Sequence, residues 1–157
     1  MNNKSKSCIV SDKDGEAFWQ PGVKGNCITI KVSPWNIEKT NHTIFLHELP
    51  KDGQVLEHFH QNDEEIFICL DGEGIIMING KEHAFKQHDI AYIAPLCKHS
   101  IKTISEISLK LMVIISPTGL EDRLKMIGIP KTVRNSVAPE KFEFAISNQN
   151  THGVVKN

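Results

Sequence analysis

The sequence lacks a dominant charge, a long apolar run and a secretion signal. Its 18 lysine and arginine residues nearly balance 19 aspartate and glutamate residues, so the formal net charge is −1. This balance provides no basic field for nucleic acid. No apolar run reaches the roughly 18 residues of a membrane-spanning helix, and the N-terminal stretch has no apolar signal segment. We therefore expect no nucleic-acid partner, no membrane partner and, by default, a cytoplasmic protein.

The cysteines do not form a metal-binding or disulfide framework. They stand without a close pair at Cys8, Cys27, Cys69 and Cys97. Zinc ribbons and disulfide-rich domains bring their cysteines close together in the sequence, so we expect reduced thiols here. The eight histidines are the more unusual feature, and three of them support the functional argument below.

Residues 28–116 read as a series of short β-strands. Segments rich in β-branched residues alternate with Gly, Asn and Asp turn signals, and Asn79 followed by Gly80 is a strong hairpin signal. This pattern predicts an all-β sandwich or barrel with its core over about 28–116. The length predicts a single domain, which we place at 15–157. The polar segment 1–14 is expected to be flexible.

After residue 116 the pattern changes to a helical one. Segment 119–128 places three apolar residues on one helical face, and Gly128 can end the helix. Those apolar residues are Leu120, Leu124 and Ile127. Pro139 can open a second short helix. We therefore expect one or two short helices in a C-terminal region over about 119–150.

Two histidines one residue apart, His58 and His60, stand at the end of a predicted strand. Alternate residues of a strand point to the same side, so both imidazoles project together. Glu65 begins the next strand, and a hairpin would place it on the same face. His99 begins a later strand. Such a group suits a divalent transition metal, whereas the histidine pair alone is more often a feature of a half-exposed strand.

These residues resemble the first conserved motif of the cupin superfamily. That motif runs from a glycine through two histidines and a glutamate to a second glycine. The matching residues are Gly53, His58, His60, Glu65 and Gly72. The gap after Gly53 is one residue shorter than the family's usual gap. In the family motif, six residues separate the glutamate from the second glycine. Counting back from Gly72 in this way gives Glu65 rather than Glu64.

The second cupin motif is present only in part. His99 keeps the metal-ligand position, and Pro95 is displaced by one residue. The other motif positions, which the family fills with Gly, Pro, Gly and Asn, hold His88, Ala94, Leu96 and Thr103. The ligand position is thus kept while its structural surroundings differ.

Further stretches resemble a single-domain cupin subgroup labelled quercetin dioxygenase-like. They are "GEAFW" at 15–19, "SPTGLE" at 116–121 and the late "HGVV". The resemblance implies a double-stranded β-helix, a jelly-roll-like barrel with a metal inside. It implies the ligand set His58, His60, Glu65 and His99. In such dioxygenases the matching glutamate also accepts a substrate proton, so Glu65 is the expected catalytic residue.

Strand periodicity predicts which side chains line the pocket. Phe67 and Cys69 share a face with Glu65, whereas Glu64 points to the other side. We add Ile101, which shares a face with His99, and His47, which can reach the pocket as a proton carrier but is more often an ordinary strand residue.

The opposite face of the same strand is also apolar, and its residues are Ile66, Ile68 and Leu70. A face of this kind has to be covered by a helix or by a partner subunit. Since cupins commonly dimerise, we predict a homodimer.

Three functions fit the expected ligand set. The first is a mononuclear metal-dependent dioxygenase acting on a small oxygenated, possibly aromatic, substrate. The second is a metal-dependent lyase or isomerase, and the third is a module that binds a small ligand without turnover. One divalent ion is expected as the cofactor, and the ligand types suit Fe, Mn, Ni, Co or Zn without choosing among them.

Overall fold

The computed structural model describes residues 7–143, which form eleven strands and one helix. The elements are β1 (Glu16–Trp19), β2 (Cys27–Val32), β3 (Thr43–Leu49), β4 (Gln54–His58), β5 (Glu64–Asp71), β6 (Glu73–Ile78), β7 (Lys81–Lys86), β8 (Ile90–Ile93), β9 (His99–Thr103), β10 (Leu109–Ser116), α1 (Leu120–Ile127) and β11 (Ile129–Pro130). No helix in this range is long and apolar enough to cross a membrane.

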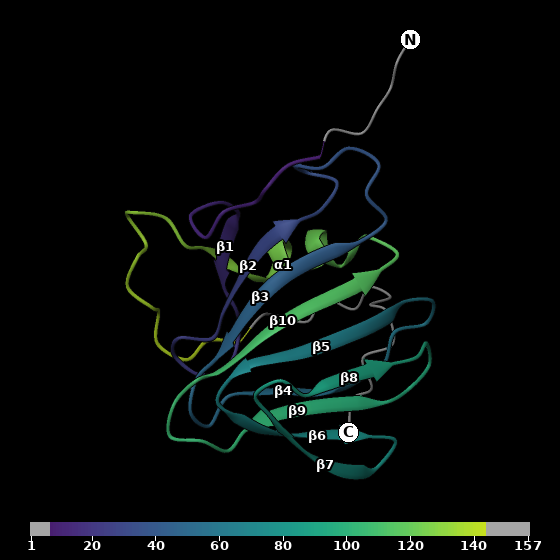
Figure 1. Ribbon diagram of the computed structural model, residues 1–157. Helices are drawn as coiled ribbons and strands as arrows, with labels where there is room; N and C mark the ends of the chain where they lie inside the picture. The colour runs from purple at the N-terminus through teal and green to yellow at the C-terminus, as the bar shows by residue number, and fades with distance from the viewer. Residues whose placement is uncertain (1–6, 144–157) are drawn as a thin grey trace.

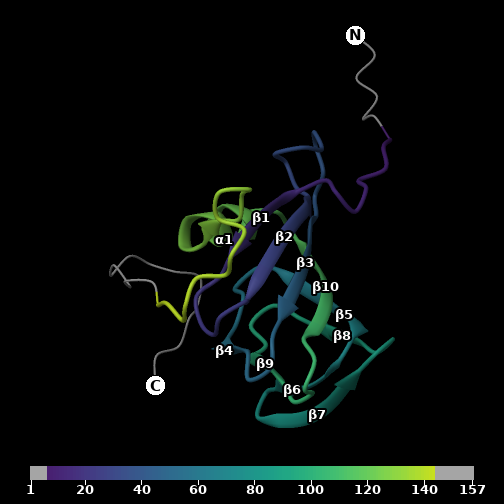
Figure 2. The ribbon, with the colours of Figure 1, turned by 90° about the vertical axis from the view of Figure 1, so that its left-hand side faces the viewer.

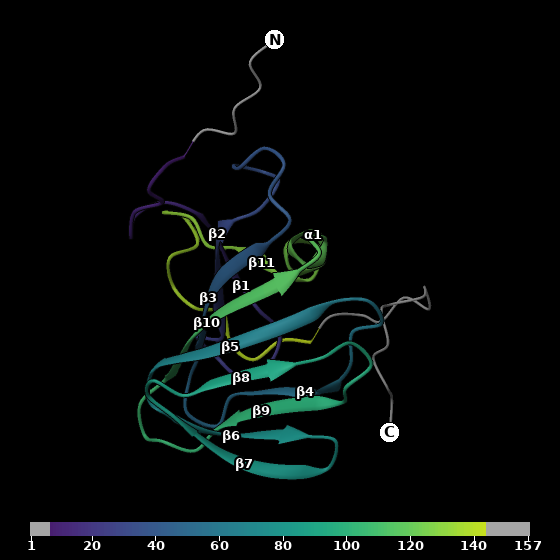
Figure 3. The same cartoon turned by 45° about the vertical axis from the view of Figure 1, so that its right-hand side comes forward.

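The strands form two antiparallel sheets (Figure 1). The seven-stranded sheet has the order β11-β1-β2-β3-β10-β5-β8, and the four-stranded sheet has the order β4-β9-β6-β7. Figure 3 shows the smaller sheet lying opposite β5 and β8. Strands distant in sequence, such as β3 and β10, are neighbours in the sheet. The predicted all-β, jelly-roll-like class is confirmed.

Alternation along the strands builds the core between the sheets. In β10 every second residue is almost fully buried, beginning with Leu109 and ending with Ile115. The partners in β3 and β5 alternate in the same register. Burying each large aliphatic side chain contributes roughly 1.5–3 kcal/mol, so this register is strongly specified.

Two predicted turns have the backbone geometry that their residues suggest. Asn79 and Gly80 have φ values of 48° and 79° and join β6 to β7 as a hairpin, which is the geometry favoured by an Asn-Gly pair. Gly72 has φ of 79°, and a Cβ there would lie 2.6 Å from the Ser108 carbonyl oxygen. The glycine of the cupin-like motif is therefore required by a close backbone approach.

The predicted helix is present as α1, which lies behind the large sheet (Figures 1 and 2). Leu120 and Leu124 pack against the core. Glu121 is buried, where it accepts hydrogen bonds from the Thr43 hydroxyl and from the Gly119 N–H. The side chain thus joins the start of α1 to β3.

The chain ends differ from the expected organisation in two respects. β1 and β11 extend the large sheet beyond the predicted core of 28–116. The described part of the predicted second helix, 139–143, is not helical, because Phe142 forms a β-bridge with Gly22. The remainder of that prediction, 144–150, lies outside the described residues, as do 1–6 of the N-terminal segment and the "HGVV" stretch.

Candidate metal centre

Four potential ligands from different segments meet at one end of the barrel. They are His58, His60, Glu65 and His99, and their ligand atoms all lie within 4.8 Å of one another. His58 ends β4 and is paired with His99 at the start of β9. Glu65 stands near the start of β5 and is only 4% exposed. The residues that the sequence predicted as ligands are thus brought together.

Glu65 is the centre of the cluster. Its Oε2 atom lies 3.1 Å from His60 Nε2 and 3.0 Å from His99 Nε2. The His58 ring lies close to the His99 ring, with 4.2 Å between ring centroids and an angle of 54° between the ring planes. One carboxylate oxygen therefore contacts two imidazoles, and the third imidazole lies against them.

Backbone carbonyl groups fix the orientation of two imidazoles. His58 Nδ1 donates to the Leu56 carbonyl oxygen at 2.8 Å, and His99 Nδ1 donates to the Cys97 carbonyl oxygen at 2.9 Å. A hydrogen on Nδ1 leaves Nε2 of a neutral ring with its lone pair exposed. This outer hydrogen bond is the usual way in which a protein aims a metal-ligating histidine.

The contact between His99 and Glu65 requires a positive charge. Because the Nδ1 hydrogen is already donated to Cys97, a neutral His99 would present a bare Nε2 lone pair to a carboxylate oxygen. A second proton on the ring or a metal ion at the cluster resolves this repulsion. The donor set of three imidazoles and one carboxylate therefore fits a divalent transition metal.

The electrostatics of the cluster keep Glu65 ionised. Burial alone would raise its pKa, but hydrogen bonds from His60 and His99 outweigh burial and lower the pKa to about 2. Burial lowers the pKa of His58 to about 4, and the neighbouring His99 adds to this effect. Burial alone would lower the pKa of His99, but its hydrogen bond to Glu65, the charge of Glu65 and the hydrogen bond to the Cys97 carbonyl together raise it. A carboxylate and a neutral imidazole are the forms that bind metals.

Glu64 occupies the opposite face from Glu65. It is exposed, and it accepts a hydrogen bond from the Tyr92 hydroxyl at 3.0 Å. Strand alternation had selected Glu65 as the inward residue, and its spacing to Gly72 had given the same choice. This placement agrees with that choice.

The four predicted pocket residues are all buried, at different distances along the barrel. The Phe67 ring centroid lies 6.0 Å from that of His99. Cys69 lies four residues further along β5 than Glu65, and its thiol contacts the carbonyl oxygens of Asp71 and Gly72 at the far end of that strand. Ile101 belongs to the apolar core. Phe67 is therefore next to the ligands, whereas Cys69 is not.

His47 is held by a residue that sequence reasoning did not identify. Its Nε2 lies 2.8 Å from Asn26 Oδ1, and the Asn26 amide nitrogen donates to the Pro21 carbonyl oxygen. Because Asn26 presents its oxygen, His47 is the donor and Nδ1 of the neutral ring is left as an acceptor. Burial lowers the pKa of His47 to about 4, while the charge of Glu65 acts in the opposite sense. Nothing in the sequence pattern links Asn26 to His47.

A second residue missed by sequence reasoning is Asp63. Its Oδ2 lies 3.8 Å from His60 Nδ1, on the side of the ring away from Glu65. A carboxylate behind a ligating imidazole raises its basicity. The acidic connection between β4 and β5 was the available signal.

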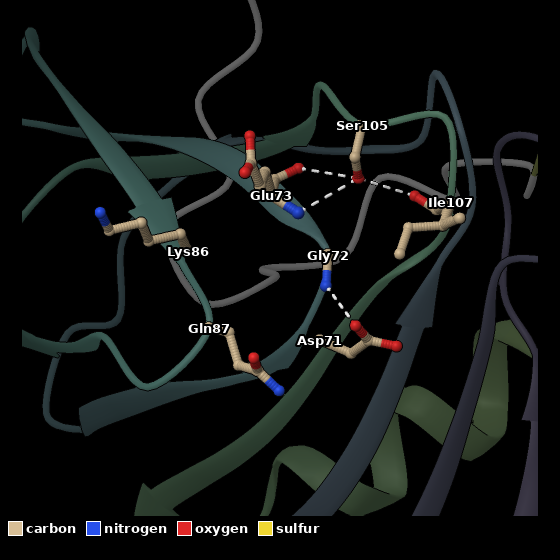
Figure 4. A pocket seen from close by; sticks show the side chains of 7 residues that line it. All are labelled: Asp71, Gly72, Glu73, Lys86, Gln87, Ser105 and Ile107. Atoms are coloured by element: carbon tan, nitrogen blue, oxygen red, sulfur yellow. Dashed lines mark hydrogen bonds between the residues drawn. The ribbon is translucent and has the colours of Figure 1, made fainter.

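A separate hollow lies at the turn that follows β5 (Figure 4). Its lining is mostly polar and consists of Asp71, Gly72, Glu73, Lys86, Gln87, Ser105 and Ile107. The Ser105 hydroxyl is engaged with the Glu73 backbone and with the Ile107 carbonyl oxygen. None of these residues belongs to the His and Glu cluster.

Comparison with known proteins supports the cupin resemblance. Residues 45–115 match the family model described as the cupin domain. An uncharacterised protein of Methanocaldococcus jannaschii is 31% identical over 64 residues, which cover 41% of this chain and 51% of that protein. The chain therefore spans about half the length of the curated relative that it matches.

Solved structures show the same fold. A predicted oxalate decarboxylase from Thermotoga maritima superposes with a TM-score of 0.63 at 21% identity, covering 71% of this chain and 100% of that chain. An RmlC-like cupin from Shewanella frigidimarina gives a TM-score of 0.62 at 13% identity, covering 75% and 97%. At these identities the likeness establishes the fold alone, and the quercetin dioxygenase-like subgroup is not confirmed.

Proposed function

The chain belongs to the cupin superfamily, and on that premise we propose that it is a mononuclear metal-dependent dioxygenase acting on a small oxygenated substrate. The observation that supports this proposal best is the convergence of His58, His60, Glu65 and His99 within 4.8 Å. The Nδ1 hydrogen bonds of His58 and His99 add to it, because they aim both Nε2 atoms at the cluster.

The bound ion supplies Lewis acidity, positions for substrate oxygens and, for a redox-active metal, a path for electrons to O₂. Fe, Mn, Ni, Co and Zn all suit three imidazoles and one carboxylate. Elemental analysis of the purified protein would identify the ion.

Glu65 has the second role in this proposal. It is a buried carboxylate whose pKa is held at about 2 by its contacts with His60 and His99. It would accept the proton of a substrate hydroxyl only when these contacts loosen, because a base with so low a pKa is weak. The imidazoles of His60 and His99 stabilise its charge before substrate arrives. A proton delivered to Oε2 would remain inside the barrel, because the carboxylate is shielded from bulk water.

His47 is the next residue of interest in the proposed pocket. With Nε2–H donated to Asn26, its Nδ1 is suited to accept a hydrogen bond from a substrate hydroxyl. Phe67 would supply an apolar surface beside the His99 ring. Together these residues favour a small substrate that carries both hydroxyl groups and an apolar or aromatic part.

A metal-dependent lyase is the second candidate. It is favoured by the likeness of fold to the Thermotoga maritima protein, which is described as a predicted oxalate decarboxylase. Cleavage of a carbon–carbon bond can use a metal ion as Lewis acid together with a proton carrier, and the cluster offers possible metal ligands and the Glu65 carboxylate. A module that binds a ligand without turnover is the remaining alternative.

Oxygen uptake separates these functions. The metal-loaded protein would be incubated with a panel of catechols, enediols and α-hydroxyketones in an oxygen electrode and, in parallel, without oxygen. Consumption of O₂ that is lost in Glu65→Gln and kept in Glu64→Gln supports the dioxygenase. Product formation without oxygen supports the lyase and overturns the dioxygenase. Bound metal without turnover of any compound also overturns the dioxygenase and supports the module that binds a ligand without turnover.

A further inference from the structure

Leu96 has a backbone conformation that a leucine rarely adopts. Its φ angle is 64°, which lies in the left-handed region. In the described range, the other non-glycine residues with positive φ are Lys39, Asp52, Asn79 and His88. Asn, Asp and His are enriched in this region, whereas a bulky apolar residue there is an outlier. Leu96 thus holds a strained conformation at a position where the second cupin motif has glycine, the residue that adopts it without strain.

Hydrogen bonds hold Leu96 between two of the four potential metal ligands. Its N–H donates to the His60 carbonyl oxygen at 2.7 Å. The next residue, Cys97, accepts a hydrogen bond from His99 Nδ1 through its carbonyl oxygen, at 2.9 Å. We call segment 94–97, which joins β8 to β9, the rim turn. Because its backbone is tied to both histidines, the surrounding structure can maintain the strain at Leu96.

The rim turn lies at the end of the barrel that contains the metal centre. Ile93, the last residue of β8, is paired in register with Glu65. Figure 3 shows the connection between β8 and β9 at the same end of the barrel as the start of β5. Of the four potential ligands, His58 is partly exposed and the other three are buried. The cluster is therefore open to solvent on the side of His58, at the end where the rim turn lies.

The Leu96 side chain does not offset the strain by packing. It is 64% exposed, whereas its neighbour Cys97 packs against the hydrophobic core. A glycine could take the same backbone conformation without the steric cost of a Cβ. Folding alone therefore does not account for a leucine at this position. Strained residues of this kind concentrate at active sites and at places where a protein clamps a ligand.

The residues around Leu96 are mostly polar. The connection to which its N–H is bonded, between β4 and β5, contains Gln61, Asn62 and Asp63, and the exposed Lys98 follows the rim turn. An apolar side chain in such surroundings gains free energy when an apolar group covers it and releases the water around both. Binding sites for small molecules combine apolar contacts of this kind with a few polar groups or a metal that fix the orientation of the ligand.

We propose that Leu96 is a specificity-determining residue, whose side chain contacts the apolar part of a small ligand held at the metal centre. The ligand class is a chelating oxygen compound with an apolar or aromatic group. Its oxygens face the His and Glu cluster, and its apolar group lies against Leu96. The proposal rests on the proposed function only for the presence of a ligand at the metal, so it applies to a dioxygenase, a lyase and a binding module alike.

Equilibrium binding of two chelators tests the role of the side chain. Acetohydroxamate and benzohydroxamate present the same oxygens but differ in apolar size, and both would be titrated into the Co²⁺-loaded full chain while its absorption spectrum is followed. The wild type should bind benzohydroxamate more tightly. Leu96→Ala should lower this preference about tenfold, the order expected for losing partial burial of a leucine, with unchanged affinity for acetohydroxamate. Leu96→Met, which has a similar volume, should keep the preference.

Thermal unfolding tests the strain separately. Leu96→Gly should raise the Tm by about 2–4 °C and lower the preference for benzohydroxamate as Leu96→Ala does. His88→Gly is the matched control. His88 has a φ of 73°, and its N–H donates to the Cys69 carbonyl oxygen, far from the metal centre. This variant should raise the Tm no more than Leu96→Gly does and should leave the preference unchanged.

The outcomes separate the contact, the strain and the proposed activity. A wild type without a preference for benzohydroxamate, or a preference that survives in Leu96→Ala, overturns the contact. An equal loss of affinity for both chelators points to a structural role and overturns it as well. A lower Tm in Leu96→Gly overturns the strain, because the leucine would then stabilise the fold. Oxygen uptake decides the dioxygenase independently, so either proposal can fail while the other holds.

Discussion

Strand β5 has two faces that differ in chemistry although the same eight residues form both. Its inward residues lead from an ionised carboxylate, Glu65, to the apolar Phe67. Its outward residues begin with a solvent-exposed carboxylate, Glu64, and continue with the half-buried Ile66 and Ile68. Two carboxylates adjacent in sequence thus belong to different environments.

This difference shows how one strand separates two tasks. Alternation sends successive side chains to opposite sides of the sheet, so a change on one face need not reach the other. We propose metal binding and chemistry for the inner face, and we predict that the outer face, which is apolar at Ile66 and Ile68, is covered in a homodimer. The predictions below test whether the two faces are independent, in order of decreasing effect.

Replacing His99 with Ala should have the largest effect on the inner face. It removes an imidazole whose orientation is fixed by Cys97 and whose Nε2 contacts Glu65. We expect metal affinity to fall by more than about a hundredfold, beyond the 10–100-fold typical of losing an outer partner. Competition titration with a chromophoric chelator would measure it.

The same variant also tests the separation of the faces. Its mass in solution should equal that of the wild type, since His99 lies inside the barrel. Ile68→Lys should show the converse behaviour, with full metal binding and altered mass. If the wild type forms the predicted homodimer and loss of metal dissociates it, the two faces are coupled and the comparison fails.

Glu65→Gln and Glu64→Gln form the sharpest pair, because they make the same change on opposite faces. An amide at position 65 can still contact the ion but cannot take a proton, so turnover should fall by roughly 10²–10⁴-fold while part of the metal is retained. Glu64→Gln should alter neither property. Metal content and steady-state rates for both variants would decide, and damage confined to Glu64→Gln would contradict the assignment.

The interior also predicts a pH dependence of stability. The pKa of His47 in the folded protein is about 4, below its ordinary value of 6.5. The contribution of neutral His47 to the free energy of unfolding is therefore fully present above pH 6.5 and is lost as the pH falls towards 4. The lowered pKa corresponds to a loss of about 3 kcal/mol in that free energy. Urea unfolding of the metal-free protein should show stability decreasing over this range.

His47→Gln is the test of that assignment. The variant should lose part of the pH dependence and keep the part due to His58, whose pKa is also lowered to about 4. His83→Gln, a change at an exposed residue of β7, is the control and should behave as the wild type. An unchanged pH profile in His47→Gln would show that His47 does not titrate in this way.

The parts of this structure that could be predicted are those with local signals. Alternation in "LKLMVIIS" and the Asn79–Gly80 turn predicted strands and a hairpin that the structure contains. The spacing of His58, His60 and Glu65 predicted a convergence that the structure contains. The expected hairpin between their strands was wrong, because β4 pairs with β9 in the small sheet and β5 belongs to the large sheet.

Features that depend on contacts between distant segments could not be predicted in this way. The bond between Asn26 and His47 joins the start of β2 to β3 through tertiary packing. The bridge of Phe142 to Gly22 replaces a helix that local propensity had favoured for 139–143. A propensity is a weak preference, and long-range pairing outweighs it.

Asp63 provides the smallest and most specific test of the inner face. It stands in the connection where the chain passes from β4 to β5, with Oδ2 3.8 Å from His60 Nδ1. Asp63→Asn keeps the shape of the side chain but removes its negative charge beside the His60 ring. We expect metal affinity to fall about tenfold, with no change in mass. Asp52→Asn, an exposed residue in the turn before β4, is the control. An unchanged affinity for Zn²⁺ in Asp63→Asn would mean that Glu65 alone orients His60.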